Sequence, residues 1–147
     1  MSAQAQVSIG GIFLFNHYGA EDLRIVKSVR FVLSRFREKW NNHGHLAASI
    51  LKQMFSDDPE GDDCTTFCID DCLMRMLELL VVLDCRSKSI AIKWFPTNSN
   101  RHQDKDVSVS FEDFVTMPMN DLLDLCSMPK EYDRVAESIT EIRDVIT

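Results

Sequence analysis

Glycine is scarce in this sequence, with only five among 147 residues. Phosphate-binding loops use several glycines because the backbone must approach the phosphate closely. The chain contains no G-x4-G-K-[ST], G-x-G-x2-G, H-E-x2-H or G-x-S-x-G pattern. We therefore expect no cofactor and no enzyme activity by these familiar routes.

Long apolar runs are also missing. The longest one in the interior, residues 76–83, contains Glu78 and falls far short of the roughly 20 residues that a membrane span needs. The first six residues are uncharged, and the apolar run that follows is too short for a secretory signal. We expect a protein without a membrane span, located in the cytoplasm with access to the nucleus.

Cysteine is present in an odd number, five, which argues against a full set of disulfides. A chain of 147 residues can bury a sizeable core without such crosslinks, so reduced thiols are expected. Hydrophobic residues make up 45% and charged residues 27%, which is typical of a folded domain. We expect residues 1–147 to form a single domain.

The hydrophobic pattern predicts an α+β fold. A strand is expected over residues 6–16, with Gly10-Gly11 inside it as a bulge or a close backbone approach, and helices over residues 23–40 and about 45–55. Thr65 or Thr66 is expected to cap a third helix that gives way near Leu79 to a strand. Strands at 79–83, 89–95 and 107–111 and helices at about 120–128 and 129–146 complete the pattern.

The predicted order is therefore β-α-α-α-β-β-β-α-α. Such a chain is expected to form a small, mostly antiparallel sheet of about four strands packed by several helices. Residues 1–5 are expected to be flexible. Residues 96–106 are polar and are expected to form a mobile loop.

Four cysteines have a spacing that invites comparison with zinc ligands. Cys64, Cys68 and Cys72 recur every fourth residue and Cys85 follows, while His43 or His45 can replace one thiolate. Three cysteines at this spacing also share one face of a helix, where they serve as small buried apolar residues. The second interpretation is preferred, and zinc is kept as an alternative.

The helix predicted at residues 23–40 is strongly basic, with six Lys or Arg residues against one acid. Its apolar stripe centres on Val29 and Phe36, which leaves an aromatic residue, Phe31, on the opposite, basic side. An aromatic side chain among cations is a natural contact residue. The candidate binding residues are Arg24, Lys27, Phe31, Arg35 and Lys39.

Three partners suit that surface: an acidic protein, nucleic acid, or acidic segments of this chain itself, within one copy or across a homo-oligomer. Residues 56–71 hold seven acids and no Lys or Arg, and residues 112–147 hold nine acids against three basic residues. The net charge of −7 opposes general attraction to phosphates. The sequence favours a non-catalytic protein-interaction module, such as an adaptor, assembly subunit, regulatory factor or viral accessory factor, over a nucleic-acid-binding or zinc-containing protein.

Overall fold

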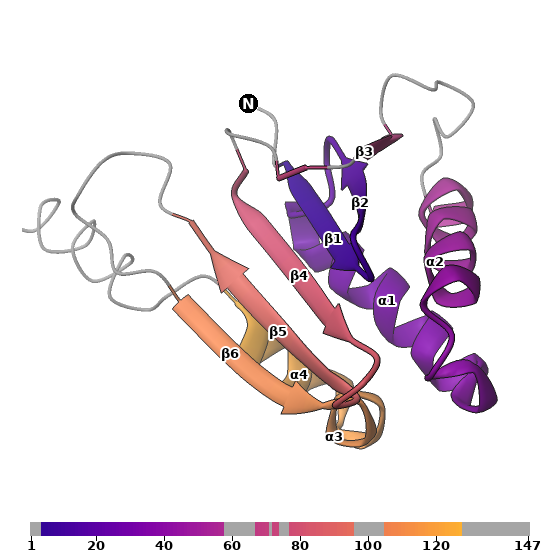
Figure 1. Ribbon diagram of the computed structural model, residues 1–147. Coiled ribbons are helices and arrows are strands. Elements are labelled where there is room, and N and C mark those ends of the chain that lie inside the picture. Colours follow the sequence, from indigo (N-terminus) through magenta and orange to yellow (C-terminus); the bar gives the residue numbers. More distant parts are fainter. Residues whose placement is uncertain (1–3, 58–66, 71, 74–76, 96–104, 128–147) are drawn as a thin grey trace, which may run out of the picture.

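The computed structural model describes residues 4–57, 67–70, 72–73, 77–95 and 105–127 of the chain. These residues form an α+β fold in which one six-stranded sheet is covered by helices (Figure 1). None of the helices in these ranges is long and apolar enough to cross a bilayer. The segments predicted as a mobile loop, apart from its last two residues, and as the final helix lie outside the described residues.

The elements follow one another in an order that differs in detail from the predicted one. They are β1 (Ala5–Ile9), β2 (Ile12–Asn16), the 3-10 turn η1 (Glu21–Leu23), α1 (Arg24–Arg35), the 3-10 turn η2 (Arg37–Lys39), α2 (His43–Asp57), β3 (Phe67–Asp70), β4 (Leu79–Asp84), β5 (Ser89–Trp94), β6 (Lys105–Ser110), α3 (Phe111–Thr116) and α4 (Met119–Cys126). The α+β class is confirmed, and the sheet has two more strands than expected.

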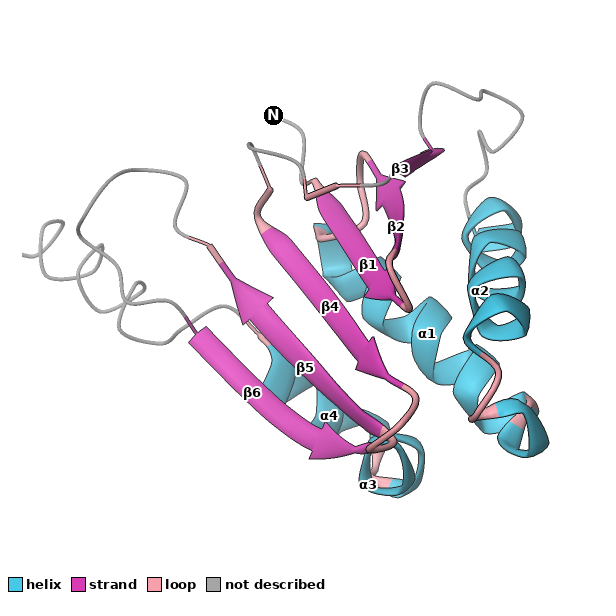
Figure 2. Ribbon diagram, in the orientation of Figure 1, coloured by secondary structure: helices cyan, strands magenta, loops and turns pink. Residues whose placement is uncertain are grey.

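The strands lie in the order β3-β2-β1-β4-β5-β6. Neighbouring strands are antiparallel except for β1 and β4, which are parallel and are connected through the helices α1 and α2 and the strand β3 (Figure 2). The register places Val7 opposite Leu14 on one side and Val81 on the other, and Val81 opposite Ile92. These four side chains therefore share one face of the sheet.

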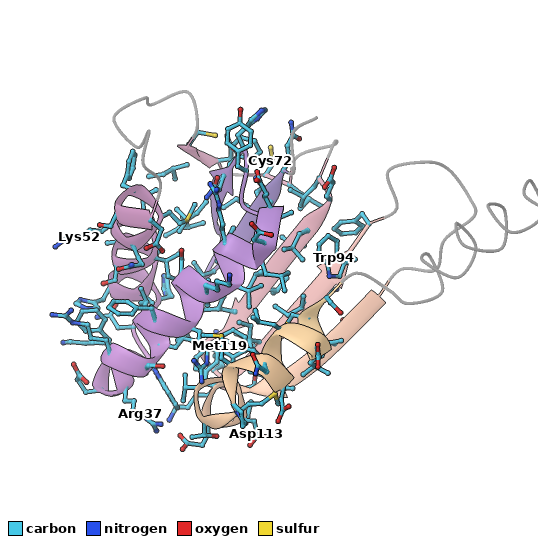
Figure 3. The ribbon with its side chains drawn as sticks, turned by 180° about the vertical axis from the view of Figure 1, so that it is seen from behind. Arg37, Lys52, Cys72, Trp94, Asp113 and Met119 are labelled. Carbon is cyan, nitrogen blue, oxygen red and sulfur yellow. The ribbon has the colours of Figure 1, made fainter. Side chains whose placement is uncertain are left out.

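That face carries the core, and the helices pack on it. Leu46 and Ile50 of α2, Ile25 and Val29 of α1, and Phe111, Phe114 and Leu122 of α3 and α4 join the strand residues in one hydrophobic cluster. Figures 1 and 3, seen from opposite sides, show the helices on the same side of the sheet. The opposite face presents the row Ser8, Val82, Ala91 and Ser108, which are partly or fully exposed.

The first predicted strand is a hairpin. Gly10 and Gly11 have φ angles of 55° and 82° and form the two-residue turn between β1 and β2, so the bulge interpretation was wrong. Two consecutive residues with positive φ are what a tight hairpin of this kind requires. A side chain on Gly10 would also collide with the ring of His43, since a Cβ there would lie 2.3 Å from its Cδ2.

Two further predictions fail at the level of single elements. Residues 67–70 form the strand β3 where a helix was expected, and Phe111 begins the short helix α3 instead of ending a strand. Ser110 caps α3, because its hydroxyl oxygen accepts a hydrogen bond from the backbone N–H of Asp113. The helices predicted at 45–55 and 120–128 are present as α2 and α4, with slightly different ends.

The helix predicted over residues 23–40 stops at Arg35. Phe36 has φ −116° and ψ 51°, which ends the α-helix, and the chain continues as the turn η2. The indole N–H of Trp40 then donates to the carbonyl of Leu33 at 2.9 Å, so a side chain satisfies a carbonyl near the helix end. Only the first three turns of the predicted helix are α-helical.

Candidate protein-binding surface

The candidate surface lies on the side of α1 that faces away from the sheet. Ile25, Val26, Val29, Val32 and Leu33 are buried against the core. Residues on the opposite side are therefore directed outward. They include Lys27, Phe31 and Arg35, which follow one another every fourth residue, and Arg24 one turn before them. We call Arg24, Lys27, Phe31 and Arg35 the basic face.

Phe31 is 48% exposed, although phenylalanine is usually buried. The other large apolar side chains that are exposed in the described part of the chain are Tyr18, Ile69, Leu73 and Met119. Only Phe31 lies on a helical stripe between cationic side chains. An aromatic side chain surrounded by charges that exclude water from its rim is a common arrangement at protein contacts.

The cations of the basic face form no ion pair with any described residue. The ion pairs in these ranges are Arg37 with Glu112, at 2.6 Å, and Lys93 with Asp106, at 3.8 Å. Arg35 lies against the ring of Phe36, with its guanidinium carbon 5.7 Å from the ring centre. Internal pairing with acids, as suggested by the sequence, thus occurs at Arg37 and not on the basic face, as far as the described residues go.

Arg30, on the same helix, has a different role. Its guanidinium donates to the backbone carbonyls of Phe114, Val115 and Met117, at 3.2, 3.3 and 2.7 Å. These are the carbonyls at the end of α3, which have no partner within the helix and attract a cation. Arg30 therefore joins α1 to α3 and α4, and it is not available to a partner.

Lys39, the fifth predicted binding residue, lies on η2 beyond the end of α1 and is partly buried. It does not belong to the stripe that contains Phe31, because the helical periodicity is interrupted at Phe36. The structure therefore brings four of the five predicted residues together.

Two of the four cysteines considered as zinc ligands, Cys68 and Cys85, lie far apart. Cys68 lies on the edge strand β3, and Cys85 follows β4, with β2 and β1 between them. Because neighbouring strands are about 4.8 Å apart, two intervening strands separate these thiols far beyond the reach of one metal ion. Cys64 lies outside the described residues, and among those described no three His, Cys, Asp or Glu side chains gather as a metal site.

The thiols of Cys68 and Cys85 are poor nucleophiles. Partial burial raises the pKa of Cys68 to about 11, and the hydrogen bond to the Asp70 carboxylate and its charge act in the same direction. Burial likewise raises the pKa of Cys85, with a contribution from Asp84. Both thiols are protonated at neutral pH, and the thiolate is the reactive and metal-binding form.

The other half of the helix layer is acidic. Residues 111–127 contain Glu112, Asp113, Asp121 and Asp124 and no Lys or Arg. Leu122 and Cys126 of α4 point into the core, so Asp121 and Asp124 are on the outer side, and Asp113 is exposed on α3. Glu112 is paired with Arg37. We call Asp113, Asp121 and Asp124 the acidic face, a feature that the sequence interpretation counted but did not localise.

Comparison of the chain with protein-family models, curated proteins and solved structures gave no match. The functional argument therefore depends on the geometry and charge of these surfaces.

Proposed function

We propose that this protein is a non-catalytic interaction module that binds a protein partner through the basic face of α1. The observation that carries the proposal is the exposure of Phe31 between cations that have no ion pair among the described residues. Phe31 supplies the apolar anchor, and Arg24, Lys27 and Arg35 supply a charged rim that selects an acidic partner. An adaptor, an assembly subunit or a regulatory factor fits this description.

The state of the cysteines supports a cytoplasmic site of action for such a module. Cys68, Cys72 and Cys85 are free thiols. Free thiols persist in reducing compartments and are rarely kept in secreted proteins.

Quantitative affinity purification tests the proposal with two matched variants. Phe31→Ala removes the anchor from the basic face, and Leu73→Ala removes a side chain that is equally exposed, at 48%, outside α1. Neither change should lower the free energy of unfolding by more than about 0.5 kcal/mol. The partner should be lost from Phe31→Ala and retained by Leu73→Ala.

Equal recovery of all partners by both folded variants would contradict the proposal. If the material lost with Phe31→Ala is RNA or DNA, and its binding weakens steeply with salt, the basic face recognises phosphates instead of a protein.

A further inference from the structure

The charges of the helix layer are separated into two halves. Residues 24–57, which include α1 and α2, hold seven Lys or Arg residues and two acids, a net charge of +5. Residues 111–127, which include α3 and α4, hold four acids and no Lys or Arg, a net charge of −4. Both halves pack on the same face of the sheet (Figure 3), so the outer sides of α1 and of α3 and α4, one basic and one acidic, belong to the same helix layer.

Both faces carry charged side chains that form no ion pair within the described part of the chain. Arg24, Lys27 and Arg35 provide three cations on the basic face, and Asp113, Asp121 and Asp124 provide three carboxylates on the acidic face. The cations and acids that lie nearest the boundary are already used, since Arg30 binds the end of α3 and Arg37 binds Glu112.

An apolar side chain accompanies each half. Met119, at the start of α4, is 39% exposed, and its sulfur lies 4.0 Å from the guanidinium of Arg30, the residue next to Phe31. Figure 3 shows Met119 between α1 and α4. Met119 thus lies near the boundary between the two halves, whereas Phe31 lies among the cations of the basic face.

We infer that the partner of the basic face is a second copy of this chain, bound through the acidic face of its α3 and α4. Because both faces lie on the outer side of the helix layer, a two-fold axis parallel to the layer, along the boundary between its two halves, places each basic face over the other copy's acidic face, and the contact is made twice. The exposed ring of Phe31 is then covered by α3 and α4 of the other copy, in the interior of the interface. This inference rests on the proposed function of the basic face and names its partner.

Sedimentation of the purified chain tests the inference. The wild type should form a dimer with a dissociation constant on the order of micromolar, as expected for an interface of modest size with charged rims. Raising the salt concentration should weaken the dimer, since exposed charges are screened. Monomers at about 0.1 mM in low salt would overturn the inference, because an interface of that strength would then be saturated. Chains longer than a dimer would also overturn it, since a two-fold contact is closed.

Charge reversal identifies the contact. The variant K27E/R35E places acids opposite acids, and the variant D121K/D124K places cations opposite cations, so each alone should dimerise at least about a hundredfold more weakly than the wild type. In an equimolar mixture each contact again joins opposite charges, and a mixed dimer should form. Two variants that each remain monomeric and do not combine would contradict the pairing of these two faces.

The outcomes separate this inference from the function on which it rests. If the wild type is monomeric but still captures a protein through Phe31, the proposed function stands and the inference that the partner is a second copy fails. A dimer that is unaffected by Phe31→Ala and by K27E/R35E would overturn the inference, and the function would fall with it only if Phe31→Ala also loses no partner in the affinity purification.

Discussion

The two halves of the helix layer use the same kinds of residue for opposite purposes. On α3, Phe114 is fully buried and holds the helix to the core, whereas Phe31 on α1 is 48% exposed. Within α1 itself, Arg30 binds three carbonyls of the neighbouring half, whereas Lys27 and Arg35 form no ion pair with the described residues. The comparison shows that the type of a residue alone does not reveal whether its side chain stabilises the fold or is exposed at the surface. Its position relative to the core decides this.

The largest effect is expected from a comparison of the two phenylalanines. Phe114→Ala leaves a cavity in the core and should lower the free energy of unfolding by about 3–5 kcal/mol. Phe31→Ala should change it by no more than about 0.5 kcal/mol, since nearly half of the side chain is exposed and it lies outside the core cluster. Denaturant titration of both variants measures the difference. Similar losses for the two would place Phe31 in the core and invalidate the basic face.

A smaller effect is expected from the basic residues of α1. Arg30→Met removes the donors for three carbonyls and should cost about 2 kcal/mol. Lys27→Met is the matched control, because Lys27 is exposed and makes no ion pair with the described residues, and it should cost no more than about 0.5 kcal/mol. Thermal unfolding of the two variants in parallel provides the measurement. If they are equally stable, Arg30 does not join the two halves as the distances indicate.

The smallest effect is expected from the ion pair at the boundary. The side chains of Arg37 and Glu112 are 50% and 55% exposed, so their coupling in a double-mutant cycle should be below about 1 kcal/mol and should shrink with salt. Arg37→Ala should cost more than Glu112→Ala, because the guanidinium also lies 5.3 Å from the centre of the Trp40 ring. A coupling that is large and independent of salt would show that this ion pair, and not Arg30, holds the two halves of the helix layer together.

Much of the fold follows from periodicity, and the exceptions have local causes. The strands β4 and β5 and the helices α2 and α4 were predicted from the spacing of their apolar residues, which are the residues buried in the core. The hairpin was missed because Gly10-Gly11 was interpreted inside one long strand, although a Gly-Gly pair between apolar residues is a turn signal. The strand β3 was missed because Thr65 or Thr66 was interpreted as the cap of a helix over the residues that follow.

The candidate surface was only partly predictable. The exposure of Phe31 follows from its angle to the apolar stripe of α1, and the structure confirms it. The different role of Arg30, compared with Lys27 and Arg35, could not be predicted, because Arg30 binds carbonyls of α3 that lie more than 80 residues away in the sequence. The position of the acidic face beside the basic face likewise depends on the strand order, which a single sequence does not reveal.

Site-specific crosslinking gives the most direct test of the claim that the basic face is a binding surface. The photoreactive residue p-benzoylphenylalanine is introduced at position 31 in one variant and at position 73 in another, two sites of equal exposure in the wild type. Position 31 should give one dominant crosslinked product in cells, and K27E/R35E in the same chain should remove it. A yield at position 31 no higher than at position 73, or a product that persists after both charges are reversed, would contradict the claim.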